Sequence, residues 1–221
     1  MSNNPEKRKP ALCNLYQQYL DSQDSAGFIN KVSQSYTPAT LQRLAEHPSR
    51  EIRRGAVLAL GFLGDYEVNQ TLGRALHDED RTVRMVAENG IRNIWTRAGN
   101  ESDRKSLAII VRLNSAQQFK EAVKQATELI EKSAWFAEAW NQRAIAFFSL
   151  GKYVESIRDC HQALEVNPYH FAAAAGMGQA YLQLGNHVSA LECFRRALRL
   201  NPSLEGVRVQ IDRLSRMIED K

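Results

Sequence analysis

The sequence predicts an all-α fold, an antiparallel helical-pair solenoid, and the main reason is internal repetition. Residues 137–170 align with residues 171–204 at a shift of 34, and residues 47–64 align with residues 78–95 at a shift of 31. In these stretches apolar residues recur three or four positions apart, which is the spacing of an amphipathic helix. A short repeat of this kind cannot bury its apolar face alone, so neighbouring repeats are expected to stack.

The apolar spacing and the Gly, Asn and Pro breakers divide the chain into thirteen predicted helices without a sheet. They cover residues 11–21, 25–34, 38–46, 50–63, 66–76, 80–97, 103–114, 117–132, 137–149, 153–166, 171–183, 187–200 and 204–219. The first two helices are expected to cap the N-terminal end of the stack. Residues 1–10 are polar, and we expect a flexible tail there.

The two 34-residue units over residues 137–170 and 171–204 have small residues and helix breakers at the same positions. The matched pairs are Ala144 and Gly178, Gly151 and Gly185, Ala163 and Ala197, and Pro168 and Pro202. Small side chains let two antiparallel helices approach, the glycine permits the turn after the first helix, and the proline ends the second. This pattern resembles the tetratricopeptide repeat. Arg143 departs from the family, which usually has a buried aliphatic residue there, so its stem is expected to snorkel or its helix to be rotated.

Further back, residues 103–136 resemble a degenerate repeat of the same kind, with Gln117 at the glycine position and Ala134 at the proline position. After the last full repeat, residues 204–219 form an amphipathic helix of the kind that closes such a stack. We therefore expect a tetratricopeptide domain over residues 105–221. A linker over residues 98–104 would precede it, because Gly and charged residues replace the apolar stripe.

The upstream repeat has a different character. Ile52 aligns with Val83, Ala56 with Ala87, Leu60 with Ile91, and Arg53 with Arg84. This pattern resembles the short HEAT repeats of phycobilin lyases and covers about residues 37–97. The resemblance implies that Asp78 and Arg84 occupy the positions of the inter-helix Asp and of the Arg that binds it. His47 replaces the Asp in the first copy. The HEAT-like domain is expected to span residues 11–97 with its capping helices.

Composition argues against several classes of protein. The chain has 221 residues and a net charge of only +4, shared between its halves, which gives weak support to nucleic-acid binding. No stretch is apolar enough to span a membrane, and the N-terminal residues lack the apolar core of a signal peptide. Cys13, Cys160 and Cys193 are too far apart for a CxxC site, so we expect reduced thiols and a cytoplasmic protein.

The sequence contains no strong catalytic motif and no metal-ligand spacing, so no enzyme activity, no metal and no cofactor are expected. The run from His77 to Asp80 suggests a helix N-cap and first-turn carboxylates more than a metal site. Gly176 and Gly178 lie in a predicted helix, so close packing is favoured over a dinucleotide loop. His161, His170 and His187 are expected to be structural.

The arginines of the HEAT-like segment remain open between three interpretations. Arg50, Arg54, Arg81 and Arg92 gather on two predicted helices that line the inner face in HEAT-like stacks. A solvated face is favoured, an acidic protein partner is the second possibility, and nucleic acid is the third because the net charge is small.

The resemblances imply a binding scaffold that uses the concave face of its repeats. Other hypotheses are a nucleic-acid-binding solenoid and an accessory factor for a cofactor-handling enzyme. The family's first helices would direct Glu138, Asn141, Gln142, Ile145, Phe148, Gln179, Leu182 and Gln183 into a peptide-binding groove. The cationic clamp of chaperone-binding members is absent, since its positions hold Leu107, Val111, Gln142, Ala172 and Gly176. The identity of the protein or peptide partner and the oligomeric state are not encoded in these patterns.

Overall fold

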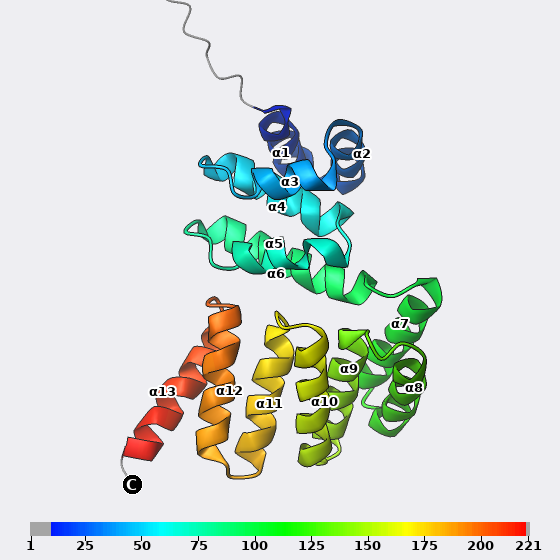
Figure 1. Ribbon diagram of the computed structural model, residues 1–221, viewed down its shortest axis with the longest axis vertical. Helices are drawn as coiled ribbons and strands as arrows, with labels where there is room; N and C mark the ends of the chain where they lie inside the picture. The colour runs from blue at the N-terminus through cyan, green and yellow to red at the C-terminus, as the bar shows by residue number, and fades with distance from the viewer. Residues whose placement is uncertain (1–9, 220–221) are drawn as a thin grey trace, which may run out of the picture. The chain divides into compact units, whose positions relative to one another are not determined.

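The computed structural model describes residues 10–219, and this part of the chain is helical with no strand (Figure 1). The prediction of an all-α fold is confirmed. The helices are α1 Ala11–Ser22, α2 Ser25–Ser35, α3 Pro38–Leu44, α4 Arg50–Leu63, α5 Asn69–Ala75, α6 Arg81–Arg97, α7 Glu101–Ser115, α8 Phe119–Lys132, α9 Ala137–Ser149, α10 Tyr153–Val166, α11 Phe171–Gln183, α12 His187–Leu200 and α13 Glu205–Glu219. The predicted tail falls almost wholly on residues 1–9, which lie outside the described residues.

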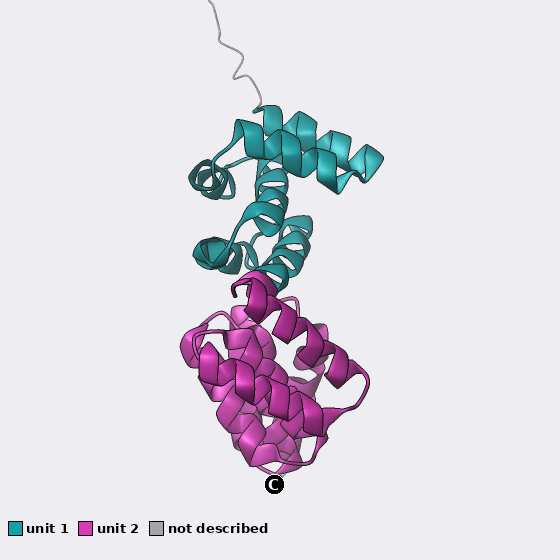
Figure 2. Cartoon of the chain, turned by 90° about the vertical axis from the view of Figure 1, so that its right-hand side faces the viewer, with its two compact units in different colours: residues 1–94 teal, residues 95–221 magenta. Residues whose placement is uncertain are grey.

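The described residues form two compact units, one ending at Ile94 and the other beginning at Trp95 (Figure 2). Unit 1 contains helices α1 to α5 and most of α6. Unit 2 contains α7 to α13. No helix among the described residues is long and apolar enough to cross a membrane.

In unit 1, local capping sets the starts of the short helices. The Asp24 side chain accepts a hydrogen bond from the Gly27 amide at 2.9 Å and so begins α2. Thr37 caps α3 in the same way, with Pro38 at the first helical position. The predicted helix over 66–76 is instead divided into a 3-10 turn, η1 Tyr66–Val68, and α5. The Val68 amide donates to the carbonyl of Asp65, three residues earlier, which is the hydrogen bond of a 3-10 turn.

The core of unit 1 lies where the long helices α4 and α6 meet. Ile52 and Leu60 of α4 and Ile91 of α6 are buried, at the aligned repeat positions. Gly61 and Gly90 bring the two helix backbones together, because a Cβ on Gly90 would lie 2.9 Å from the Gly61 Cα. A side chain at either position would push the helices apart, so the close crossing requires glycine.

In unit 2, the four helices of the two full repeats have the predicted bounds. Helix α7 begins at Glu101, inside the predicted linker, because Asn100 and Asp103 form a reciprocal capping box. Ala144, Ala163 and Ala197 are buried in one cluster between the helices, as the small-residue pattern predicts. Gly178 lies against the Phe194 ring, and an added Cβ would lie 2.7 Å from it.

The turns between paired helices share one backbone conformation. Gly151 and Gly185 have φ of 74° and 72°, and Gln117, which lies 34 positions before Gly151 in the turn between α7 and α8, has φ of 58°. This left-handed region favours glycine, so Gln117 adopts it against its intrinsic preference. The α7–α8 pair thus has the same left-handed turn as the two full repeats, without the residue that suits it.

Replacement of this residue by glycine should therefore stabilise the protein. We expect Gln117→Gly to raise the free energy of unfolding by about 0.5–1 kcal/mol, since relief of the left-handed strain outweighs the greater entropy of the unfolded glycine. Urea denaturation of the full chain would measure the difference. Gln118→Gly, next to it but with negative φ, is the control and should not stabilise. A loss of stability in Gln117→Gly would contradict this explanation of the turn.

Candidate peptide-binding face

The predicted groove residues lie on α9 and α11, the first helices of the two full repeats. The Ile145 side chain is 42% exposed, and Gln183 is also exposed. Gln142, Phe148, Gln179 and Leu182 are half-buried. The Phe148 ring packs edge-on against the Tyr153 ring at 5.4 Å, which fixes its position beside the turn into α10. These two helices therefore present apolar surface and amide groups together.

Asn141 is located differently from the prediction. Its side chain is only 6% exposed, and its amide donates to the Glu138 Oε1 at 3.0 Å. The Gln142 amide donates to the same oxygen at 2.8 Å, while Asn114 of α7 donates to the Gln142 carbonyl groups. Because Glu138 is itself buried, both amides stabilise an internal charge, and Asn141 is not positioned to contact a partner.

The buried Glu138 carboxylate also pairs with His170 across the repeat. The His170 Nε2 lies 2.9 Å from the Glu138 Oε2, and the His170 Nδ1 accepts a hydrogen bond from the Ala173 amide. The imidazole proton is therefore on Nε2, which donates to Glu138. Burial raises the pKa of Glu138, but the hydrogen bonds from His170, Gln142 and Asn141 more than offset this and lower it. The Trp95 ring stacks on His170 at 4.3 Å.

Arg143 does not snorkel to solvent, because its side chain is largely buried. Its guanidinium binds both carboxylate oxygens of Asp159, at 2.7 and 2.9 Å, and donates to the Thr127 hydroxyl at 2.9 Å. The Trp140 and Phe147 rings lie against it. Burial raises the pKa of Asp159, and the guanidinium opposes that rise. The family's usual aliphatic contact is thus replaced by a buried ion pair between α9 and α10.

The arginines of unit 1 form a ladder between repeats. The Arg53 guanidinium binds both oxygens of Asp78, at 2.7 and 2.9 Å, and donates to the His47 and Pro48 carbonyls. Arg84, which the resemblance implied as the Asp78 partner, instead donates to backbone carbonyls just before its own helix, including that of Asp78. Asp78 is therefore held by the arginine of the preceding repeat.

The predicted acidic-partner face is only partly open. Arg54 makes two bonds of 2.9 and 2.6 Å to Asp80, so its charge is already paired. Arg92 donates to Glu88 and Arg50 to Glu51, both at exposed positions, and Arg81 is exposed. Asp80 also accepts the Val83 amide, which confirms that the acidic run caps α6. Paired arginines leave less positive charge for nucleic acid or an acidic partner than the sequence suggests.

The Arg54–Asp80 pair should give the protein an acid-sensitive component of stability. Hydrogen bonds from Arg54, opposed by burial, lower the pKa of Asp80 to about 2. An unfolded Asp titrates near 3.9, so the folded state binds fewer protons and stability is lost between about pH 4 and about pH 2. We expect Asp80→Asn, which can still cap α6, to flatten the decline in melting temperature across that interval. An unchanged acid profile would contradict this assignment.

The buried cysteines are inert by environment. Burial raises the pKa of Cys160 to about 12 and that of Cys193 to about 11. Thiolates are therefore scarce at neutral pH, and these side chains behave as small apolar groups. Within the described residues no three His, Cys, Asp or Glu side chains lie close enough to hold a metal ion.

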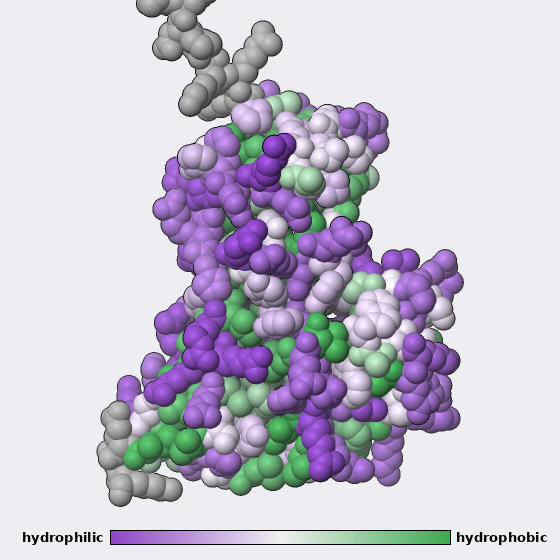
Figure 3. Space-filling model, viewed as in Figure 1, coloured by the Kyte–Doolittle hydropathy of each residue, from purple (hydrophilic) through white to green (hydrophobic). Residues whose placement is uncertain are grey.

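On the face drawn in Figure 3, hydrophobic residues reach the surface over several helices of unit 2, among hydrophilic ones.

The positions that form the cationic clamp in chaperone-binding members of the family hold no cation in this chain. Leu107 is buried, Val111 is exposed, and Ala172 and Gly176 of α11 are half-buried. None of these clamp positions therefore offers the positive charge that would bind the carboxylate of a peptide.

Comparison with known families agrees with this repeat organisation. Residues 37–128 match the family model of HEAT repeats, and residues 135–203 match that of the tetratricopeptide repeat. The chain is therefore a helical-repeat protein in which HEAT repeats are followed by tetratricopeptide repeats. The HEAT match runs over α7 and much of α8, the region where we predicted the linker and the start of a degenerate tetratricopeptide repeat.

The chain is also similar to individual tetratricopeptide repeat proteins. A tetratricopeptide repeat-containing protein of Rhizobium etli is 43% identical over 42 residues, which is 19% of this chain and 21% of that protein. The chain therefore matches only about a fifth of the length of this curated relative.

Among solved structures, the Arabidopsis OM64 tetratricopeptide domain is 26% identical with a TM-score of 0.52, over 53% of this chain and 97% of that one. The first such domain of Spaghetti (RPAP3), bound to an HSP90 peptide, is 19% identical with a TM-score of 0.53, over 55% and 96%. The second such domain of human RPAP3, in complex with an HSP70 peptide, is 23% identical with a TM-score of 0.50, over 53% and 98%. The two RPAP3 likenesses show the fold alone.

Proposed function

We propose that the chain is a non-enzymatic scaffold that binds a peptide segment of a partner protein on α9 and α11. The observation that carries this proposal is the exposed Ile145 on α9, together with the half-buried Phe148 on α9 and Leu182 on α11. Large apolar side chains at the surface of stacked repeats are typical of a contact site. Two solved domains of the same fold hold peptides, which supports this use of the face.

The chemistry of the face favours an uncharged segment. The peptides bound by those two domains end in Glu-Glu-Val-Asp, a strongly acidic sequence. This chain has no cation at the clamp positions, and Arg143 is already bound to Asp159. A carboxylate placed there would lose its hydration without a compensating charge. We infer that the partner segment is neutral and partly apolar.

The amides supply the polar part of recognition. Gln179 and Gln183 lie one turn apart on α11, so they face the same side of the helix. A primary amide both donates and accepts, which suits the N–H and C=O groups of a peptide backbone. In the proposal these two glutamines orient the segment, while Ile145, Phe148 and Leu182 contact its side chains. Gln142 was also predicted for the groove, but its amide already donates to Glu138 and its side-chain carbonyl accepts from Asn114. Asn141 has no part in recognition, because it is committed to Glu138.

The experiment begins with affinity purification of partners from the native organism, followed by calorimetric titration of the captured segment. The variant is Ile145→Ser combined with Gln179→Ala, and we expect its affinity to fall at least tenfold. The matched control is Val188→Ser, which removes a comparable exposed apolar side chain from α12. Equal affinities of the variant and the wild type would refute this location of the site.

A further inference from the structure

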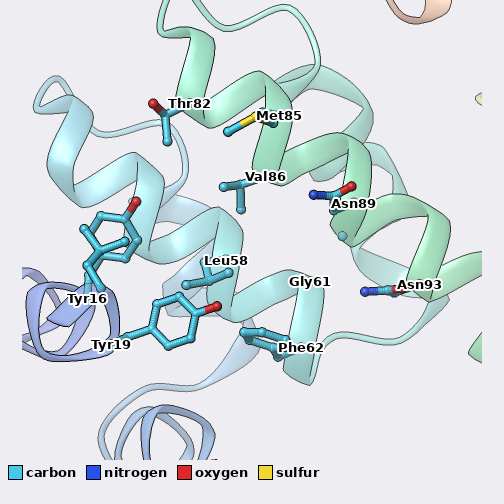
Figure 4. Close-up of a pocket in the computed structure, with 12 residues that line it drawn as sticks. Tyr16, Tyr19, Leu58, Gly61, Phe62, Thr82, Met85, Val86, Asn89 and Asn93 are labelled. Carbon is cyan, nitrogen blue, oxygen red and sulfur yellow. The ribbon is translucent and has the colours of Figure 1, made fainter. Parts of the chain in front are cut away.

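Unit 1 contains a pocket that the function proposed above does not use. It lies between α1, α4 and α6, has a volume of about 290 Å³, and is lined by twelve residues (Figure 4). The close crossing at Gly61 and Gly90 leaves no side chain at these two positions, so helix backbone forms part of its wall. A volume near the lower end for ligand pockets suits one or two side chains better than a large cofactor.

The lining is mostly apolar and carries no charged side chain. Tyr19 and Phe62 form an aromatic wall that is itself supported by Phe28, with ring centroids between 5.3 and 6.4 Å apart. Figure 4 shows Val86 between this wall and the α6 backbone, and Met85, which is 56% exposed, lies at the rim. Since nothing in the lining could pair with an ion, a charged occupant would lose its hydration without compensation.

Two amides lie along the α6 side of the pocket. Asn89 and Asn93 are four residues apart, so they follow one another on the same face of the helix, as Figure 4 shows. Their positions are about 6 Å apart along the helix axis, close to the roughly 6.7 Å that separates alternate residues of an extended chain. Amides at this spacing match the backbone groups of alternate residues in an extended peptide and exceed what a small apolar molecule would need.

We propose that this pocket is a second recognition site, which takes an uncharged aromatic or branched aliphatic side chain from an extended segment of a partner protein. Asn89 and Asn93 bind the backbone beside that side chain. The chain's own residues 1–9 do not suit the pocket, because they are polar and include three cations and Glu6. The site lies on different helices from the face on α9 and α11, so either proposal can fail without the other.

The test uses blocked amino acids as probes of the full chain. N-acetylphenylalanine amide and N-acetylleucine amide are titrated while the Met85 methyl and Val86 methyl resonances are observed by NMR. We expect saturable shifts with a dissociation constant on the order of 1 mM. The corresponding lysine and glutamate amides should bind at least tenfold more weakly.

Two variants and one control locate the binding. Val86→Phe should fill the pocket and abolish the probe-induced shift of the Met85 methyl resonance. Val188→Phe makes the same change at an exposed position of α12 and should leave that shift intact. Asn89→Ala alters only an exposed side chain, so folding is retained, and it should weaken the phenylalanine amide at least threefold while p-cresol binds unchanged.

Several results would overturn the proposal. The first is that charged and neutral probes cause equal shifts. The second is that p-cresol binds but neither N-acetylphenylalanine amide nor N-acetylleucine amide does. The third is that the Met85 methyl shift persists in Val86→Phe. A Met85 methyl resonance that moves with protein concentration alone would also overturn it, because a second copy of the chain would then occupy the pocket.

Discussion

Arg143→Met should destabilise the protein by about 3 kcal/mol or more, because it leaves a buried carboxylate without its cation. Asp159 is 4% exposed, and both of its oxygens are bound by Arg143. The methionine fills much of the space but gives no hydrogen bond to Asp159 or Thr127. Chemical denaturation of the full chain, monitored by helical circular dichroism, would measure the loss.

The pH dependence of this variant has a definite sign. Without the guanidinium, burial alone raises the pKa of Asp159 above its unfolded value, so the folded state binds more protons than the unfolded state. Stability then falls as pH rises, and the deficit should be larger at about pH 7 than at about pH 5. The control is the double variant Arg143→Met, Asp159→Leu, which should recover most of the loss. A single variant as stable as the wild type would show that the pair contributes nothing to the repeat.

Ala163→Leu should cost about 1–3 kcal/mol, since it adds three carbons to a closed interface. Ala163 has no exposed surface and lies in the cluster formed with Ala144, Leu164 and Ala197. The helices α9, α10 and α11 would have to separate or adopt strained rotamers. The melting temperature should fall accordingly.

An exposed position provides the control for this substitution. Ala108→Leu makes the same chemical change on the surface of α7 and should alter stability by less than about 0.5 kcal/mol. An unchanged melting temperature in Ala163→Leu would mean that the helices do not meet at Ala163.

Local signals account for most of the fold that could be predicted. Turn glycines, Asn-Pro stops and small residues at a constant shift determine where α9 to α12 begin and end, and these bounds are as predicted. The weaker boundaries depend on single hydrogen bonds. The Asn100 cap starts α7 earlier than predicted, and a 3-10 bond at Val68 divides the predicted helix over 66–76.

The candidate site was less predictable because its polar groups pair across long distances in sequence. Asn141 faces inward since Glu138 binds His170, which is 32 positions away in the chain. Arg143 pairs with Asp159 on the next helix, and Arg54 pairs with Asp80, which lies just before α6. The sequence contains a usable hint only for the Arg143–Asp159 pair, since Arg143 stands where the repeat family usually has a buried aliphatic residue.

The most direct test of the central claim is methyl NMR of isoleucine-labelled full chain, titrated with the segment captured from the native partner. If α9 and α11 bind the segment, the Ile145 methyl resonance should shift in proportion to occupancy. The Ile157 methyl resonance on α10 and the Ile52 methyl resonance in the core of unit 1 should remain in place. Saturable binding that leaves Ile145 unmoved would contradict the account, and shifts confined to unit 1 would transfer the peptide-binding role to the HEAT repeats.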